Sequence, residues 1–372
     1  MKSWAVWLLL CVGLLGSQSL RADDTVIAKT DSQVKSSVLP QKGATTFDLA
    51  QTILPLSAGQ FAVGRWDGSL QLWDLPPSRS NQGPTLRSVS TLPSRAGVLS
   101  LVKIEEGLVL SSHDQGSLAL WTQTEGGFAL RSIVEFPSQL GAVTSGALVS
   151  VGTQKVLLIG HESGFVSLWQ KTRWSLAWLG QTDVRSPSPV PSPYALRHIR
   201  AVVPWKDSLV LVGSEDGDVT QLRLRLVAHG VDAVVIHRAR HSPTAQRGIN
   251  GMALLGDLLA VTSCTVGSEP NLHLLRVEPG RLVPLDALEL KRDSQREQVF
   301  SFAVLAVDRP SGKTLWVSTQ EGLVWQVLVV DEKLRRWGSV SVSSGVGTAL
   351  FYDKERQLLV AVGHEATVLR VP

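Results

Sequence analysis

The stretch Gly64–Trp73, GRWDGSLQLW, contains a turn that recurs along the whole chain. Later copies have the same layout, an acid or amide close before a glycine and apolar residues after it: SHDQGSLALW from Ser112, GHESGFVSLW from Gly160, GSEDGDVTQL from Gly213 and STQEGLVWQV from Ser318. The turn glycines are spaced by 48, 48, 53 and 105 residues, and the last interval is about twice the others. A copy with a longer turn fills that gap at Leu258–Val277, and GHEATVLRV from Gly363 is the seventh.

Each copy predicts four β-strands. A short apolar run before the turn, such as Phe61–Val63, suits a strand that is covered on both faces. The alternation after the turn, with Leu70 and Leu72 between polar residues, suits a half-buried strand. Another apolar segment precedes each pair and a more polar one follows it. Seven copies of four strands in about 50 residues each predict an all-β fold, a seven-bladed β-propeller with four-stranded antiparallel blades.

The two ends of the chain predict how the ring closes. The seventh copy ends at Pro372 after its third strand, and TVIAK at Thr25–Lys29 is a spare strand. We expect the N-terminal segment 23–42 to supply the closing strand of the last blade, which removes exposed sheet edges. The expected blades of this single domain, 23–372, are approximately 43–95, 96–140, 141–196, 197–247, 248–297, 298–343 and 344–372.

The repeated residues resemble the WD40 repeat family across residues 24–372. The resemblance rests on Trp66-Asp67-Gly68 with Leu72-Trp73-Asp74, on Leu120-Trp121, Leu168-Trp169 and Asp216-Gly217. The Gly-His that usually opens such a repeat is absent, and Ser94–Gly97 and Ser138–Gly141 stand there instead. The Asp–His–Ser–Trp hydrogen-bond set of the family is therefore expected to be incomplete. Quinoprotein-like propellers also use Asp-Gly turns and remain the alternative repeat type.

Residues 1–22 have the layout of a secretory signal peptide. Lys2 precedes an apolar run, Trp4–Leu15, and cleavage is expected after Ala22 or after Ser19. Lipidation at Cys11 and an uncleaved anchor helix are the alternatives. The segment predicts export, and we expect a periplasmic protein with no integral membrane span in the mature chain, because no later apolar run approaches the roughly 18 residues that a helix needs.

Composition excludes several classes. An apolar fraction of 44% and a net charge of +4 do not fit a disordered chain. Removal of the signal peptide leaves 34 positive and 32 negative residues, a balance that gives no case for nucleic-acid binding. It also leaves Cys264 as the only cysteine, so no internal disulfide is possible.

The residue just before each turn defines a repeated position, named here the pre-turn position. Its seven residues are Arg65, His113, His161, Ser214, Cys264, Thr319 and His364. A metal site is one interpretation, because imidazole and thiolate bind borderline metal ions, and adjacent blades would bring only His113 and His161 together. The structural interpretation is that this side chain ties the turn to the preceding loop, and it is favoured because packed sheets lie about 10 Å apart.

The loops between blades are the candidate partner-binding surface. A proline-rich insertion, 186–194, and the segments 237–247 and 291–298 should emerge on one face with a cluster of basic residues. The candidate partner-binding residues are Arg238, Arg240, Arg247, Lys291, Arg292 and Arg296, together with the aromatic residues Trp178 and Tyr194. No sequence motif of a hydrolase, a phosphate loop or a haem site occurs, so no catalytic residue and no cofactor is expected.

These observations predict a non-catalytic, exported, monomeric propeller that acts as a protein-interaction scaffold or accessory subunit in the cell envelope. A metal- or cofactor-dependent periplasmic propeller enzyme of the oxidoreductase type is one alternative. An envelope-complex assembly factor is the other. The protein partner itself is not identified by the sequence.

Overall fold

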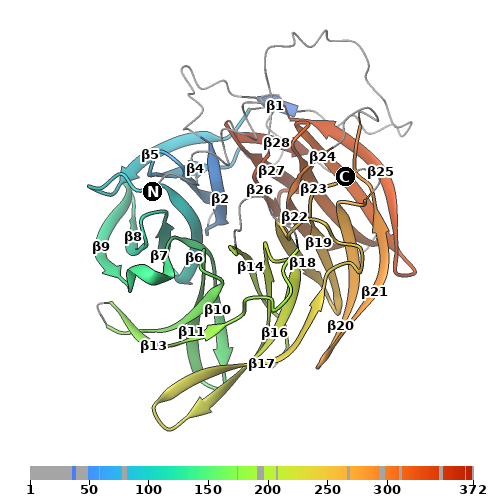
Figure 1. The fold of residues 1–372 in the computed structure, drawn as a ribbon. Coiled ribbons are helices and arrows are strands. Elements are labelled where there is room, and N and C mark those ends of the chain that lie inside the picture. Colours follow the sequence, from blue (N-terminus) through green and yellow to red (C-terminus); the bar gives the residue numbers. More distant parts are fainter. Residues whose placement is uncertain are drawn as a thin grey trace.

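Seven four-stranded antiparallel sheets are arranged as blades around a common axis (Figure 1). The computed structural model describes residues 36–38, 49–57, 59–77, 82–173, 175–190, 197–206, 208–265, 269–292, 298–309, 312–342, 347–364 and 366–370. The expected signal peptide, 1–22, lies outside these residues. The predicted all-β, seven-bladed propeller is confirmed.

The first four blades follow the chain. They consist of β2 (Ala50–Pro55), β3 (Gln60–Arg65), β4 (Ser69–Asp74) and β5 (Thr85–Thr91); β6 (Val98–Glu105), β7 (Leu108–His113), β8 (Ser117–Thr124) and β9 (Gly127–Glu135); β10 (Val143–Val151), β11 (Gln154–His161), β12 (Phe165–Lys171) and β13 (Leu176–Asp183); and β14 (Ile199–Pro204), β15 (Leu209–Ser214), β16 (Asp218–Val227) and β17 (Gly230–Arg240). In each blade the first strand lies nearest the axis and the fourth lies at the periphery (Figure 1).

The last three blades complete the ring. They consist of β18 (Gly251–Leu255), β19 (Leu258–Thr262), β20 (Leu272–Glu278) and β21 (Arg281–Leu288); β22 (Ser301–Arg309), β23 (Gly312–Thr319), β24 (Leu323–Val330) and β25 (Lys333–Ser341); and β26 (Ala349–Asp353), β27 (Leu358–Val362) and β28 (Ala366–Arg370) with β1 (Ser36–Val38) as outer strand. A short 3-10 turn, Ser138–Leu140, is the helical element among the described residues.

The N-terminal strand closes the ring, as predicted. β1 pairs antiparallel with β28, with Ser37 opposite Val368. The expected strand Thr25–Lys29 lies outside the described residues, and the described strand falls later in the chain at Ser36–Val38. The first and last blades are also joined near the axis, where the Ala50 N–H donates to the Gly363 carbonyl at 2.9 Å.

Apolar side chains between adjacent sheets form the core. One cluster joins the third and fourth blades and includes Val156, Val212 and Leu222, each almost fully buried. Similar clusters lie between the other neighbouring sheets. Burial of these faces contributes roughly 25 cal/mol per Å² of apolar surface and holds the blades at fixed angles. The apolar runs before each turn are buried on both faces for this reason.

A β-bulge recurs in the outer strand of each of the six blades whose fourth strand follows directly in the chain. The pairing between third and fourth strands skips one residue at the same place in β5, β9, β13, β17, β21 and β25. The skipped residues are Arg87, Arg131, Leu179, Ile236, Leu285 and Trp337. A bulge increases strand twist and interrupts the ladder, so these edges are poor templates for another strand.

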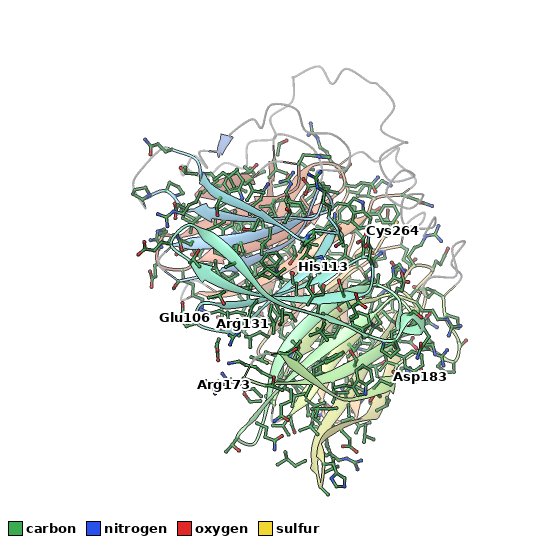
Figure 2. All side chains as sticks on the ribbon, turned by 90° about the vertical axis from the view of Figure 1, so that its left-hand side faces the viewer. Glu106, His113, Arg131, Arg173, Asp183 and Cys264 are labelled. Carbon is green, nitrogen blue, oxygen red and sulfur yellow. The ribbon has the colours of Figure 1, made fainter. Side chains whose placement is uncertain are left out.

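The ring has two different faces. The upper face carries the turns between second and third strands and the connections from each blade to the next; the lower face carries the remaining turns. In Figure 2 the upper face is at the right, where Asp183 and Cys264 are labelled, and the lower face is at the left, where Glu106 and Arg173 are labelled. No helix within the described ranges is long and apolar enough to cross a membrane.

Candidate functional site

The pre-turn position lies on the upper face. Five of its residues end the second strand of their blades as predicted, namely Arg65, His113, His161, Ser214 and Thr319. The prediction is wrong for Cys264 and His364, which lie two residues beyond the ends of β19 and β27. Cys264 leaves its own ladder because it bridges to Phe300 of the next blade.

In the second blade, the pre-turn histidine belongs to a buried hydrogen-bond chain. Trp121 Nε1 donates to Ser111 Oγ at 2.7 Å, and this oxygen lies 2.8 Å from His113 Nε2. His113 Nδ1 lies 3.1 Å from the carbonyl oxygen of Ala96. A carbonyl only accepts, so Nδ1 carries the proton and Nε2 accepts from the serine hydroxyl. His113 therefore ties the turn to the connection from the first blade.

The third blade builds a similar chain from a different serine. His161 Nε2 lies 2.7 Å from Ser167 Oγ, and Trp169 Nε1 donates to the same oxygen at 2.8 Å. The serine comes from the third strand here, whereas Ser111 belongs to the second strand. The family-like Trp–Ser–His part of the network, expected to be incomplete, thus forms in two blades.

Both histidines are held neutral by their surroundings. Burial lowers the pKa of His113 and of His161 to about 4. The bond from His113 Nδ1 to the Ala96 carbonyl ties the turn to the preceding connection, as the structural interpretation predicts, whereas the bond between His161 and Ser167 lies within the third blade. The described residues contain no group of three or more His, Cys, Asp or Glu side chains that could hold a metal ion.

A carboxylate follows the pre-turn position in three successive blades. These residues, Asp114, Glu162 and Glu215, begin the turns between the second and third strands, on the upper face. His198 sits between two of them, with Nδ1 3.5 Å from Glu215 Oε2 and Nε2 3.9 Å from Glu162 Oε2. Arg200 Nε donates to Glu215 Oε1 at 2.6 Å.

Burial controls the charges of these residues. It raises the pKa of Glu215, a rise that the Arg200 guanidinium opposes. It also raises the pKa of Asp114, and the nearby Glu162 carboxylate adds to that rise. Burial, and then the positive charge of Arg200, lower the pKa of His198 to about 2, so its ring is uncharged.

Turn carboxylates also hold the connections between blades. In four blades a carboxylate of the second-to-third-strand turn accepts a hydrogen bond from a backbone N–H of the connection that enters the blade. The bonds are Gly97 N to Asp114 Oδ1 at 2.8 Å, Ser186 N to Asp216 Oδ2 at 2.8 Å, Gln246 N to Glu269 Oε2 at 3.2 Å and Arg292 N to Glu321 Oε2 at 2.9 Å. We name these four bonds the turn staples. Each of them ties one backbone N–H of a connection to the blade that the connection enters.

Arg240, a candidate partner-binding residue, is engaged inside the molecule. Its Nη1 donates to the Asp216 carbonyl at 2.5 Å, and its Nη2 donates to the Ser188 carbonyl. Its Nε also lies 3.4 Å from Asp218 Oδ1. Arg240 thus fastens the start of the proline-rich insertion to the fourth blade.

The other described basic candidates differ in how far they reach the surface. Arg238 is half-buried beside Thr220, and Lys291, with its side chain 10% exposed, has Nζ 3.6 Å from Glu289 Oε1. Arg247 is half-buried. Burial raises the pKa of Glu269, and the Gln246 N–H and the positive charge of Arg247 oppose that rise. Arg292 is exposed. Arg296 and Tyr194 lie outside the described residues.

Trp178 lies in β13, away from these loops. Its ring packs edge-to-face on that of Trp169 with centroids 5.0 Å apart, and it remains 39% exposed. β13 begins at the lower face, and Trp178 pairs there with Trp169 near the end of β12. The structure therefore does not bring Trp178 together with the arginines of the connections.

Comparisons with solved structures agree with this architecture. A structure of U3-55K superimposes with a TM-score of 0.64 at 12% sequence identity, covering 91% of this chain and 98% of that one. A crystal structure of RRP9 WD40 repeats gives a TM-score of 0.65 at 12% identity with the same coverages. This chain has the WD40-type propeller fold. No family model and no curated protein sequence matched the chain.

Within the WD40-type propeller, sequence reasoning missed the role of the turn carboxylates. In the sequence Asp216 indicates only an Asp-Gly turn, yet its carboxylate accepts the Ser186 N–H and its carbonyl accepts the Val190 N–H at 2.9 Å. Asp114 and Glu321 play the same part in other blades. The available signal was the recurrence of an acid within three residues before each turn glycine.

Proposed function

We propose that this WD40-type propeller is a non-catalytic, exported protein that binds protein partners on its upper face, as a scaffold or accessory subunit in the cell envelope. The signal-peptide layout of residues 1–22 supports the exported location. The solved structures that resemble the chain support the propeller, and the binding role rests on the upper face itself.

The observation that carries the proposal is the set of turn staples. Three successive long connections, into the fourth, fifth and sixth blades, are each bonded at one described residue to a carboxylate of the blade they enter. Loops that only link strands need no such bonds, since long loops are tolerated on a surface. A loop held in one conformation loses less entropy on binding, so stapled loops suit a preformed binding surface.

Charge suggests where a partner would bind. Arg247 and Arg292 belong to the stapled connections into the fifth and sixth blades, and Arg292 is exposed. Two half-buried carboxylates, Asp114 and Glu162, lie on the same face over the second and third blades, whereas Glu215 is buried and bonded to Arg200. A partner that spans both regions would meet opposite charges at the two ends, which fixes its orientation.

Affinity capture from the native envelope tests the proposal. We expect the wild-type protein to retain a partner that also binds the purified propeller, and the pair Arg247→Glu with Arg292→Glu to weaken that binding at least tenfold. The control pair, Lys313→Glu with Arg335→Glu, changes exposed cations on the lower part of the sixth blade and should bind as the wild type does. Capture of no partner at native expression, or equal binding by both pairs, would overturn the proposal.

A further inference from the structure

The hairpin of the fourth blade is longer than its counterparts. β16 has 10 residues and β17 has 11, against 6 and 7 for β4 and β5 in the first blade. The end of this hairpin projects beyond the outline of the ring (Figure 1). The extra length lies at the end remote from the stapled upper face, because the other end of β16, at Asp218, pairs with Arg240.

The base of this hairpin is firmly held. Leu222, Leu224 and Val231 are buried in the core between the third and fourth blades. Thr182 Oγ1 of β13 donates to the Ala233 carbonyl at 2.9 Å. The ladder between β16 and β17 continues out to Val227, which pairs with Gly230. The hairpin is therefore a paired, anchored projection with a defined register.

The tip of the hairpin is apolar and exposed. Leu226 is 56% exposed and Val227 is 45% exposed, and Ala228 next to them is also exposed. Leu226 is the most exposed of the large apolar side chains in the described residues. Tight hairpin tips usually carry Asn, Asp or Gly, which favour the turn and meet water. Three consecutive apolar residues at this point expose apolar surface to water, which is unfavourable in free energy. Contact with an apolar phase would remove that unfavourable hydration.

The charges around the tip are mainly positive. The part of the hairpin near the tip, residues 223–234, has two arginines, Arg223 and Arg225, and one carboxylate, Asp232. Asp232 is neutralised across the hairpin, where Arg225 Nη2 lies 2.7 Å from its Oδ2. Arg223, two residues before Arg225 on β16, is exposed. The tip is therefore an apolar end with a cationic flank.

We propose that the tip of the β16–β17 hairpin, Leu226–Ala228 flanked by Arg223, docks the propeller on an anionic lipid surface. A projecting apolar end matches the interface of a bilayer, where aliphatic side chains enter the acyl boundary and cations meet the headgroups. A protein pocket for the same tip would need a complementary concave acidic surface. The lipid contact leaves the stapled upper face open and does not depend on the partner proposed for it.

Sedimentation with vesicles tests the proposal on the full mature chain. Vesicles of phosphatidylcholine alone are compared with vesicles that also contain phosphatidylglycerol. We expect the protein to sediment with the anionic vesicles and to be released by added salt, which screens the headgroup attraction. Leu226→Asp with Val227→Asp should weaken this binding at least tenfold, since two half-exposed aliphatic side chains no longer leave water.

Two further variants separate the lipid contact from other effects. Val89→Asp with Ile133→Asp introduces the same charges at exposed apolar residues of β5 and β9, and should bind vesicles as the wild type does. Arg223→Glu should weaken binding to anionic vesicles. Failure of the wild type to sediment with anionic vesicles, or equal binding by the two aspartate pairs, would overturn the proposal. The proposal would also be overturned if the tip variant still bound vesicles and lost only the captured protein partner.

Discussion

The free energy of unfolding should fall between about pH 7.5 and pH 5.5, and replacing His113 with asparagine should make that fall smaller by about 1.4 kcal/mol. Burial lowers the pKa of this ring from 6.5 to about 4. Between these two values the unfolded chain binds a proton that the folded chain does not, so stability present above pH 6.5 is lost as the pH falls towards 4. About pH 5.5 lies one unit below 6.5, and one unit corresponds to about 1.4 kcal/mol.

Urea unfolding followed by tryptophan fluorescence measures this difference at both pH values. The wild type alone is not diagnostic, because burial raises the pKa of carboxylates such as Glu215, which gain stability as the pH falls. Comparison of the wild type with His113→Asn cancels those groups. The matched control is Ser111→Ala, which breaks the same hydrogen-bond chain without removing the titrating ring. It should lower stability about equally at both pH values. A pH dependence of His113→Asn equal to that of the wild type would refute the reasoning.

Three further changes test the fold. Gly68→Ala should destabilise the protein by more than about 1 kcal/mol, because φ is +82° and the new Cβ would lie 2.7 Å from backbone atoms, whereas Gly126→Ala has open space and should be nearly neutral in urea unfolding. Trp121→Phe should cost about 1 kcal/mol through loss of its bond to a buried serine, measured in the same way; an unchanged midpoint would contradict this. Deletion of residues 23–42 removes β1, leaves β28 as an open edge and should lower the thermal midpoint; unchanged melting would disprove the closure.

The sequence was sufficient for the architecture because one local requirement recurs. The turn glycines have positive φ, +82° at Gly68 and Gly164 and +79° at Gly116, which side chains rarely adopt. A repeat of such glycines between apolar runs predicts hairpins at a fixed period. The ring and its blade number follow from that period, whereas the N-terminal closure was inferred from a seventh copy with only three strands, and the described closing strand lies at Ser36–Val38.

The hydrogen-bond chains were less accessible because they depend on distances across the sheet. Ser167 serves His161 from the third strand, whereas Ser111 serves His113 from the second. A search for one serine position would therefore find only one of them. The contacts of Arg240 are equally hidden, because its acceptor Ser188 lies 52 residues away in the chain. For Arg247 and Arg292, the partner-binding role stays a prediction.

The recurrent bulge in the outer strands has a consequence at the scale of many molecules. A closed ring of sheets still exposes an outer strand on every blade. Without the bulges, several of these strands could pair with outer strands of neighbouring molecules and form a two-dimensional lattice. One skipped residue in six of these strands interrupts such pairing without changing the core. Backbone pairing at the perimeter is thereby disfavoured, and this leaves the two flat faces of the ring for contacts that depend on shape and charge.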